Sequence, residues 1–249
     1  MGFKTFVINL ERSPERLQNI QSELQREGIE FHRIAAIDGK SLPLGQHGYG
    51  LQVDTSNFER ELTPGEIGCA LSHVAALREF LNSDADIALV LEDDVVLVPG
   101  IRDTIQSFID WATTSDTRFR AANLGQVAKQ PFSPLLQVSS HTFGRSYYYP
   151  LTAAALLWTR QGAAHFLHTN SKIPAPIDIQ FRKWIGRSGL GLGVRPPLAK
   201  QSGVSSDIAE RKTTTHRRSL TYRYRSYRRK FREKADAVFA YFMEGLVGR

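Results

Sequence analysis

Three consecutive carboxylates, Glu92, Asp93 and Asp94, interrupt an apolar segment that is rich in β-branched residues. The flanking residues, 87–91 and 95–97, are typical of a strand buried on both faces of a sheet. Buried carboxylates are costly unless a cation lies beside them. We therefore expect a divalent metal ion here. Hard oxygen ligands favour Mn²⁺ or Mg²⁺, which commonly join protein carboxylates to the phosphates of a substrate.

Alternation along a strand places Glu92 and Asp94 on one side and Asp93 on the other. Either the outer pair or the central residue could therefore be the direct metal ligand. The alternation is less strict here, because the strand ends at these residues. The alternative without a metal is an acidic turn at the end of a strand.

The elements before this segment predict a parallel sheet. Residues 3–10 read as a strand, Ser13-Pro14-Glu15 is a helix start, Gly28 ends that helix, and residues 29–34 form a second strand. A strand-helix-strand unit pairs in parallel through a right-handed crossover. Its carboxyl edge is where α/β sheets bind nucleotides.

Several candidates for donor binding follow the first strand. Asn9 and Leu10 stand at its end, where the Asn9 amide suits uracil or ribose. Arg12 suits a phosphate group, because its guanidinium makes two parallel hydrogen bonds. For Arg12 and Arg16 the alternative is a solvated helix face paired with acidic neighbours, and we favour it for Arg16.

The later elements are less regular. Thr63 and Glu66 form a capping box that begins a helix over residues 63–82. The patterns also predict helices at 101–111, 161–168 and 177–184, strands at 119–125 and 152–159, and an extended segment at the sheet edge over 194–201. Residues 126–149 resemble a mobile loop over a site.

Five segments together resemble glycosyltransferase family 25, the lipopolysaccharide and lipooligosaccharide glycosyltransferases. They are residues 7–16, 36–39, 62–73, 91–94 and 176–178, and the resemblance extends over residues 3–208. It implies an α/β, GT-A-like nucleotide-sugar-binding fold with a mixed, mainly parallel sheet flanked by helices. It also implies a UDP-sugar donor, with galactose before glucose, a divalent metal (Mn²⁺ first, Mg²⁺ second) and inversion at the anomeric carbon.

The resemblance also assigns roles to residues. Asp178 becomes the general base that takes the proton of the acceptor hydroxyl. The residues expected to bind the donor are Asn9, Leu10, Arg12, Asp38, Ser72, His73, Glu92, Asp93 and Gln201. The residues expected to bind the metal are Glu92, Asp93 and Asp94.

Each of these roles has a structural alternative. Asp38 could belong only to a turn, Ser72 and His73 to a satisfied core pair, Glu66 to a helix cap, and Asp178 to a helix N-terminus. Gln201 and residues 205–207 match a late family segment that closes over the diphosphate. Residues 147–149 are tyrosines that could stack on acceptor sugars, and for at least one of them we favour core packing.

Composition sets the broad class. The chain has 249 residues, of which 41% are hydrophobic, which excludes a disordered chain. The single cysteine, Cys69, excludes a disulfide framework and a cysteine-based zinc site, and it fits a small core residue in a reducing compartment. No apolar run approaches the ~20 residues of a membrane span. The start lacks the pattern of a signal peptide, so we expect a cytoplasmic protein.

The net charge of +7 is concentrated near the C-terminus. Residues 211–234 hold eleven Lys and Arg and one acid, Glu233. We therefore expect a transferase domain over residues 1–208 and a basic, amphipathic, helical extension over 209–249. Residues 211–249 suit an anionic membrane surface. A solvated helix is the alternative, and nucleic acid is the least favoured partner.

These observations predict a metal-assisted, inverting hexosyltransferase that acts on a lipid-linked oligosaccharide of the lipooligosaccharide or lipopolysaccharide type. It would be peripheral to the inner face of the cytoplasmic membrane. The alternative is a non-catalytic binding protein with a degenerate transferase domain and a tail that binds membrane or nucleic acid. The intact acidic triplet argues against it. A nucleotidyltransferase or phosphotransferase is disfavoured, because no glycine-rich phosphate loop is present.

Overall fold

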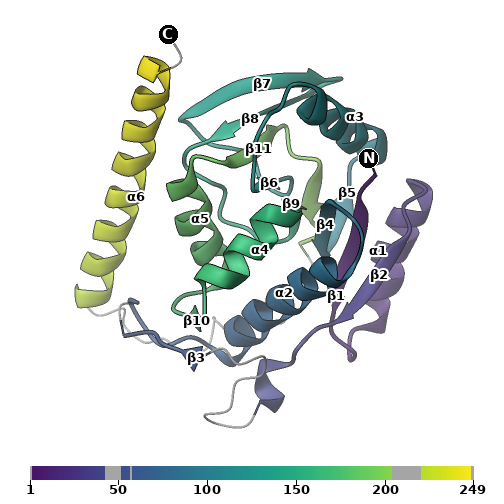
Figure 1. The fold of residues 1–249 in the computed structure, drawn as a ribbon. Coiled ribbons are helices and arrows are strands. Elements are labelled where there is room, and N and C mark those ends of the chain that lie inside the picture. The colour runs from purple at the N-terminus through teal and green to yellow at the C-terminus, as the bar shows by residue number, and fades with distance from the viewer. Residues whose placement is uncertain (1, 43–51, 57, 204–219, 248–249) are drawn as a thin grey trace.

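A central sheet lies between two layers of helices in the computed structural model, which describes residues 2–42, 52–56, 58–203 and 220–247 (Figure 1). Within the described residues the large sheet has eight strands in the order β2-β1-β4-β9-β6-β11-β8-β7. The strands are β1 Lys4–Asn9, β2 Phe31–Ala35, β4 Ile87–Glu92, β6 Ala121–Asn123, β7 Phe132–Val138, β8 His141–Ser146, β9 Ala155–Thr159 and β11 Gly191–Arg195. Two short pairs join β3 Gln52–Val53 to β10 Lys172–Ile173 and β5 Val95–Leu97 to β12 Ala199–Gln201.

The sheet is mixed and mainly parallel in strand direction, as the sequence predicts. Strand β1 runs parallel to β2 and β4, and β11 runs parallel to β6. Strand β9 is antiparallel to β4 and β6, and β8 is antiparallel to β11 and β7. Six of the eight strands therefore run one way, and β9 and β8 run against them.

The helices divide between the two faces. They are α1 Pro14–Arg26, α2 Pro64–Asn82, α3 Ile101–Thr114, α4 Arg160–Thr169, α5 Ile177–Ser188 and α6 Leu220–Val247, with a short 3₁₀ turn, η1, at Gly39–Ser41. Along β4, Ala88 and Val90 face the core under α2, α4 and α5, whereas Leu89 and Leu91 face the core under α1 and α3. Both faces of β4 are buried, which explains its continuous apolar sequence.

The helix starts follow local rules. Helix α1 has Pro14 at its first position, and Gly28 follows its end with a φ of +62°. In α2 the side chain of Thr63 accepts from the Glu66 N–H and the Glu66 carboxylate accepts from the Thr63 N–H. These two boundaries agree with the sequence prediction.

Two sequence expectations about strands are wrong, the second only in part. Residues 126–149 are not a long loop: β7 and β8 form a hairpin at the edge of the sheet. Its core anchor is Phe143, whose ring stacks on Phe108 at 4.3 Å between centroids. Pro134 interrupts the alternation of β7 and is tolerated because β7 is the edge strand. The predicted edge segment 194–201 divides: it begins in β11, which is wrong for an edge because β11 lies between β6 and β8, and it ends in β12, which pairs with β5 alone among the described strands.

Two glycines let the loop after β2 approach the N-terminal turns of α2. A Cβ on Gly39 would lie 1.7 Å from the carbonyl oxygen of Pro64, and one on Gly68 would lie 2.4 Å from that of Ile37. Such contacts exclude any side chain at either position. The glycines thus fix the distance between this loop and α2, which carries site residues.

No described helix combines the length and the apolarity that crossing a bilayer would require. The expected domain boundary at 208/209 and residues 205–207 lie outside the described residues.

We predict opposite effects for two helical glycines. Gly68→Ala should lower the free energy of unfolding by about 2 kcal/mol or more, because its Cβ meets backbone. In Gly186→Ala, on α5, the new Cβ would lie no closer than 3.6 Å to any neighbouring atom. This substitution should raise the free energy of unfolding by about 0.5–1 kcal/mol through helix propensity. Urea unfolding of both variants measures this, and equal effects would contradict the close-approach argument.

Candidate functional site

The carboxyl ends of β1 and β4 bring the acidic triplet beside Asn9. The two strands are parallel neighbours, and Ile8 lies opposite Glu92. The next residue of each chain segment, Asn9 and Asp93, therefore leaves the sheet at the same edge. This edge is the one that the sequence predicts for the site.

Asp93 points toward α1 and is held by protein groups. Its Oδ2 accepts a hydrogen bond from Asn9 Nδ2 at 2.7 Å, and its Oδ1 lies 3.4 Å from Arg16 Nη1. Burial raises the pKa of Asp93, while Asn9 and Arg16 act to lower it. Asn9 itself is 1% exposed, donates also to the Ser13 carbonyl and accepts from Arg33. Its amide is therefore engaged within the protein, contrary to its expected role toward uracil or ribose.

Glu92 points toward α2, on the opposite side of the strand from Asp93. Its Oε1 lies 3.1 Å from His73 Nε2 and 3.7 Å from Cys69 Sγ. One ligand atom from each of these three residues lies within 4.8 Å of the others, which is compact enough to hold a metal ion. The sequence suggests a small core residue at Cys69; the structure places its thiol in a candidate mixed donor set with His73 and Glu92.

Asp94 is the unpaired member of the triplet. Its Oδ1 is buried and has no hydrogen-bond partner among the described residues. Burial, with the negative charges of Glu92 and Asp93, raises its pKa to about 6. A buried carboxylate oxygen without a donor is unfavourable in the protein alone. This residue and the half-buried Glu92 together offer hard oxygen donors that fit Mn²⁺ or Mg²⁺.

Asp178 approaches the triplet from α5. Phe181, one turn further along α5, packs edge-on against the His73 ring, with 5.7 Å between centroids. Burial raises the pKa of the Cys69 thiol, and the charges of Glu92, Asp178 and Asp94 raise it further. Asp178 is half-buried, and its Oδ1 accepts from the Ile179 N–H at 2.8 Å. Glu92 therefore contacts Cys69, and the charges of Asp94 and Asp178 are close enough to act on its thiol.

The loop after β2 is fixed beside this group. Arg12 and Asp38 form an ion pair, and both side chains are partly exposed. Ser72 is 1% exposed: its hydroxyl accepts from the Ile37 N–H and donates to the Gly68 carbonyl. Ser72 thus holds the loop in place and offers no free group to a donor, contrary to its expected role. Glu66 is a cap and pairs with Arg60, the alternative left open for it.

Gln201 joins the site through strand pairing. It lies on β12 opposite Val95 of β5, and the Ser202 N–H donates to the Asp94 carbonyl at 2.7 Å. The exposed Gln201 side chain is therefore next to the triplet, as its place in the sequence suggested.

The predicted donor-binding residues fall into two groups. Asn9, Ser72 and His73 are each 1% exposed and Asp93 is 9% exposed, so they position other groups. The accessible ones are Leu10, Arg12, Asp38, Glu92 and Gln201.

The tyrosines at 147–149 do not present free rings for an acceptor. Tyr149 is fully buried and Tyr147 nearly so. The Tyr148 ring lies 4.3 Å below the Arg182 guanidinium, and its hydroxyl accepts from the same residue. The expected stacking on sugars is therefore wrong for Tyr147 and Tyr149.

Two residues that sequence reasoning undervalued belong to the site. Cys69 lies one helical turn before His73, and this i, i+4 spacing on the helix preceding an acidic strand was the available signal. Arg16 was assigned to a solvated helix face, but it lies against Asp93 with only 18% of its side chain exposed.

A family model described as "Glycosyltransferase family 25 (LPS biosynthesis protein)" matches residues 3–181. Procollagen galactosyltransferase 2 of Mus musculus is 36% identical over 101 residues, which is 38% of this chain and 16% of the relative. A procollagen lysyl hydroxylase and glycosyltransferase of Acanthamoeba polyphaga mimivirus is 30% identical over 186 residues, 67% of this chain and 20% of the relative. The chain thus spans a fifth or less of the length of these relatives.

Among solved structures, a glycosyltransferase involved in the glycosylation of the major capsid of PBCV-1 is similar over 85% of this chain and 97% of its own. The sequence identity is 13% and the TM-score is 0.47.

We predict that the ionised Asp94 destabilises the metal-free protein. A carboxyl group with a folded pKa of about 6 and an unfolded value of 3.8 binds its proton more tightly when folded. Its ionisation therefore lowers stability above about pH 6 and has little effect at pH 4. In EDTA, Asp94→Asn should raise the free energy of unfolding at pH 8 by about 1–2 kcal/mol, with the gain shrinking toward pH 4.

The matched control is Asp110→Asn, because Asp110 is an exposed acid on α3. This substitution should leave the free energy of unfolding unchanged at every pH tested. Urea unfolding at pH 4, 6 and 8 measures the difference. A loss of stability in Asp94→Asn at pH 8 would show that its charge is already satisfied within the protein.

Proposed function

Because the chain belongs to glycosyltransferase family 25, we propose that it transfers a hexose from a UDP-sugar to a glycan acceptor with inversion at the anomeric carbon. The observation that carries this proposal is the buried, unpartnered Asp94 Oδ1 beside Glu92, with Asp178 near enough for its charge to act on the same Cys69 thiol. An inverting transfer needs a group that binds the diphosphate and a carboxylate that takes a proton, and these residues supply both.

Galactose is the preferred donor sugar and glucose the next. Support for galactose comes from the relatives, among them one named a procollagen galactosyltransferase. This relative is much longer than the chain. We therefore take from it only the donor sugar and not the acceptor.

We propose that Glu92 and Asp94 hold a divalent ion, Mn²⁺ before Mg²⁺, with Asp93 serving as a support. The buried, unpartnered Oδ1 of Asp94 and the hard carboxylate oxygens fit such an ion. When bound, the ion would neutralise charge on the diphosphate and act as a Lewis acid. Asn9 and Arg16 keep Asp93 turned toward α1, whereas Glu92 and Asp94 are close enough for their charges to act on each other and on Cys69.

Asp178 is the proposed general base. As the acceptor oxygen attacks the anomeric carbon, its proton passes to the Asp178 carboxylate, and the bond between the sugar and UDP breaks with its electron pair on UDP. The first turn of α5 favours a negatively charged side chain there, which keeps the carboxylate ready to accept a proton. Arg12, paired with Asp38 at the rim, is the proposed contact of the departing phosphates.

The acceptor we propose is a lipid-linked oligosaccharide of the lipopolysaccharide or lipooligosaccharide type, at the inner face of the cytoplasmic membrane. Support comes from the family description, which names LPS biosynthesis. A non-catalytic binding protein remains the alternative, and it is distinguished by the absence of UDP release from every donor tested.

We predict that Asp178→Asn lowers kcat by about 10²–10⁴-fold, because the general base is lost. UDP binding should change little, since Asp178 contacts the acceptor side of the reaction. Transfer is measured by UDP release, and UDP binding by calorimetry.

The matched control is Asp103→Asn, another acid in the first turn of a helix, on α3 away from the site. Its turnover should equal that of the unaltered protein. Near-normal turnover of Asp178→Asn would remove that residue from the mechanism.

We predict that Mn²⁺ with UDP raises the Tm and that EDTA reverses the rise. Ligand at a hundredfold excess over its Kd stabilises by about 2.7 kcal/mol. Glu92→Gln and Asp94→Asn should each lose most of this rise and most of the activity. Glu79→Gln, an exposed acid on α2, is the control. Full metal response in Asp94→Asn would show that the ion binds elsewhere.

A further inference from the structure

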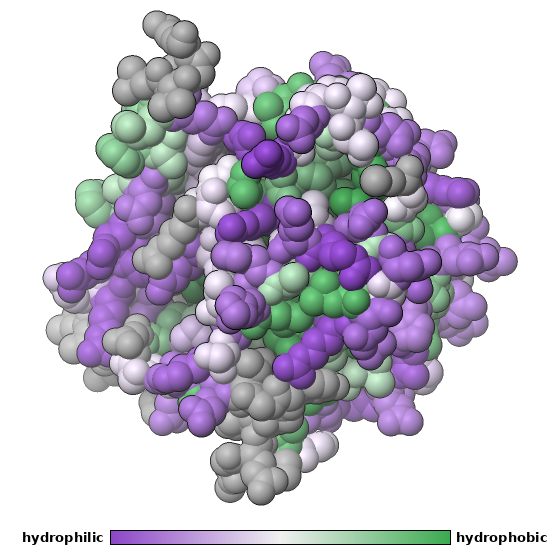
Figure 2. Space-filling view, viewed as in Figure 1, coloured by the Kyte–Doolittle hydropathy of each residue, from purple (hydrophilic) through white to green (hydrophobic). Residues whose placement is uncertain are grey.

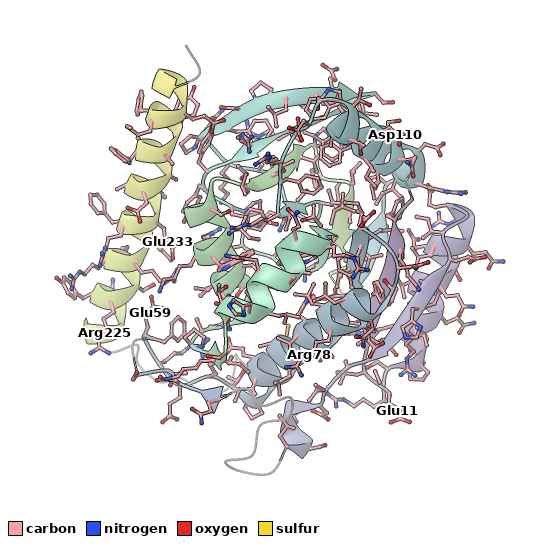
Figure 3. All side chains as sticks on the ribbon, viewed as in Figure 1. Glu11, Glu59, Arg78, Asp110, Arg225 and Glu233 are labelled. Atoms are coloured by element: carbon pink, nitrogen blue, oxygen red, sulfur yellow. The ribbon has the colours of Figure 1, made fainter. Side chains whose placement is uncertain are left out.

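Helix α6 is fixed to the outside of the domain beside α5 by an ion-pair network (Figures 1 and 3). Arg229 donates to Glu59 Oε1 at 2.6 Å. Glu233 lies 3.0 Å from Arg229 and 3.8 Å from Arg182 of α5. The side chains of Glu59 and Glu233 are largely buried, so these pairs are not ordinary surface contacts.

The same face of α6 continues toward its C-terminal end. Ala237 is buried, and the Tyr241 ring lies edge-on to Tyr147 at 5.4 Å between centroids. Glu244 accepts from the Tyr147 hydroxyl at 2.5 Å and lies 2.9 Å from Arg145. These contacts recur every three or four residues over several turns, so they fix which face of α6 points outward.

The opposite face of α6 exposes large apolar and aromatic side chains. They are Tyr224, Tyr227, Phe231, Val238, Phe239 and Phe242, and Phe231 is the most exposed at 74%. At about 100° per residue, Tyr224, Phe231 and Phe242 lie about half a turn from Glu233, and the other three lie within about 60° of that direction. Such a concentration of exposed aromatic side chains on one helix marks an interaction surface.

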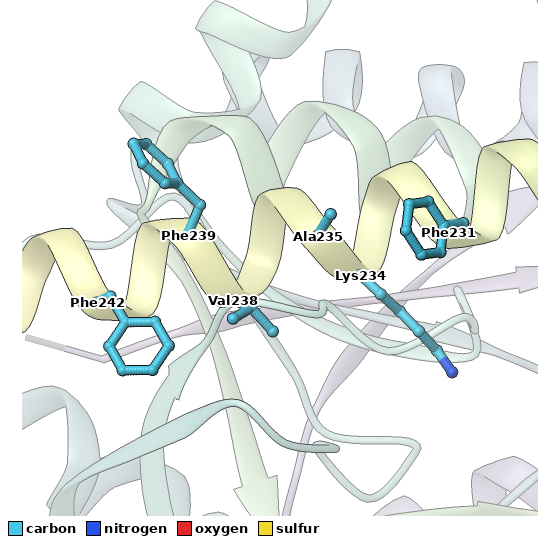
Figure 4. A pocket seen from close by; sticks show the side chains of 6 residues that line it. All are labelled: Phe231, Lys234, Ala235, Val238, Phe239 and Phe242. Atoms are coloured by element: carbon cyan, nitrogen blue, oxygen red, sulfur yellow. The ribbon is translucent and has the colours of Figure 1, made fainter.

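This surface is open. Phe231, Lys234, Ala235, Val238, Phe239 and Phe242 line it, and all of them belong to α6 (Figure 4). Among the described residues no second element forms an opposing wall. The apolar stripe is therefore convex, which suits a broad, soft partner better than a small ligand that needs enclosure.

Cations flank the N-terminal part of the stripe, around Tyr224, Tyr227 and Phe231, and the stripe continues beyond them to Phe242. The described basic residues of α6 other than Arg229 are Arg223, Arg225, Arg228, Lys230, Arg232 and Lys234. Of its acids, Glu233 and Glu244 are turned to the domain, which leaves Asp236 outside. Figure 2 shows the hydrophilic residues over the lower part of α6 and the hydrophobic ones over the upper part.

We propose that the outer face of α6 lies in the headgroup region of an anionic lipid bilayer, with Phe231, Phe239 and Phe242 inserted. A helix with an apolar stripe flanked by Lys and Arg has this property. A second copy of the chain would place its own Lys and Arg side chains against those of α6. Binding of RNA through its phosphates would leave the apolar residues 238–243 without a contact. This proposal rests on the proposed function, because a lipid-linked acceptor would lie at the same membrane surface.

The test is co-sedimentation of the full chain with vesicles of phosphatidylcholine alone or with phosphatidylglycerol. The unaltered protein should bind the anionic vesicles and be released by high salt. The variant with Phe231→Ser, Phe239→Ser and Phe242→Ser should bind at least tenfold more weakly. Arg228→Ser with Arg232→Ser should weaken binding by about 10–30-fold, at roughly one kcal/mol per charge.

The matched control is Val127→Ser, because Val127 is 49% exposed and lies outside α6; it should bind as the unaltered protein does. Circular dichroism checks that each variant is folded. Equal vesicle binding by the triple Phe variant would overturn the proposal, as would salt-insensitive binding or a shift to dimers or RNA complexes without vesicle binding. UDP release is measured separately, so a failure of the transferase proposal leaves vesicle binding intact and is recognised as such.

Discussion

Three negative charges are held together at the end of β4, and much of the surrounding structure limits the cost of keeping them there. Like charges in a partly buried site repel one another strongly, because little water screens them. Asp93 is balanced by Asn9 and Arg16 from the α1 side. Glu92 lies within hydrogen-bond distance of His73 on the α2 side, at 3.1 Å. Asp94 is left with a buried oxygen that nothing in the described protein satisfies, and this residual cost is what a bound cation would relieve.

The end of β4 separates the two roles. Glu92, the last residue of β4, points toward α2, and Asp93, in the turn that follows, points toward α1. The α1 side anchors Asp93, whereas the chemistry that we propose lies on the side of α2 and α5. The α2 side must be placed accurately, and the close backbone contacts at Gly39 and Gly68, with the Ser72 hydroxyl, provide that placement. Residues that first resemble ligands thus serve as supports, and the accessible groups stand in front of them.

Sequence signals predicted the boundaries of an element correctly where those boundaries are set by residues adjacent in sequence. The proline start and glycine end of α1 and the capping box of α2 depend on residues within one turn, so they were predictable. The hairpin of β7 and β8 was not predictable from local signals. Pro134 breaks the alternation of apolar and polar residues in β7, and Phe143 packs against Phe108, which lies on α3. The burial of Tyr147 likewise depends on Glu244 of α6, nearly a hundred residues later.

The sequence by itself determined the acidic triplet, its place at the end of a buried strand, the family pattern and the basic, aromatic composition of the C-terminal segment. These follow from residue type and short-range spacing. Only the tertiary structure decided that Asp93 is held by Asn9 and Arg16 while Asp94 Oδ1 has no partner among the described residues, that Glu92 lies against Cys69 and His73, and which face of α6 points outward. The reason is physical: a carboxylate's role depends on the donors and charges within a few ångströms, and here those come from elements far apart in the chain.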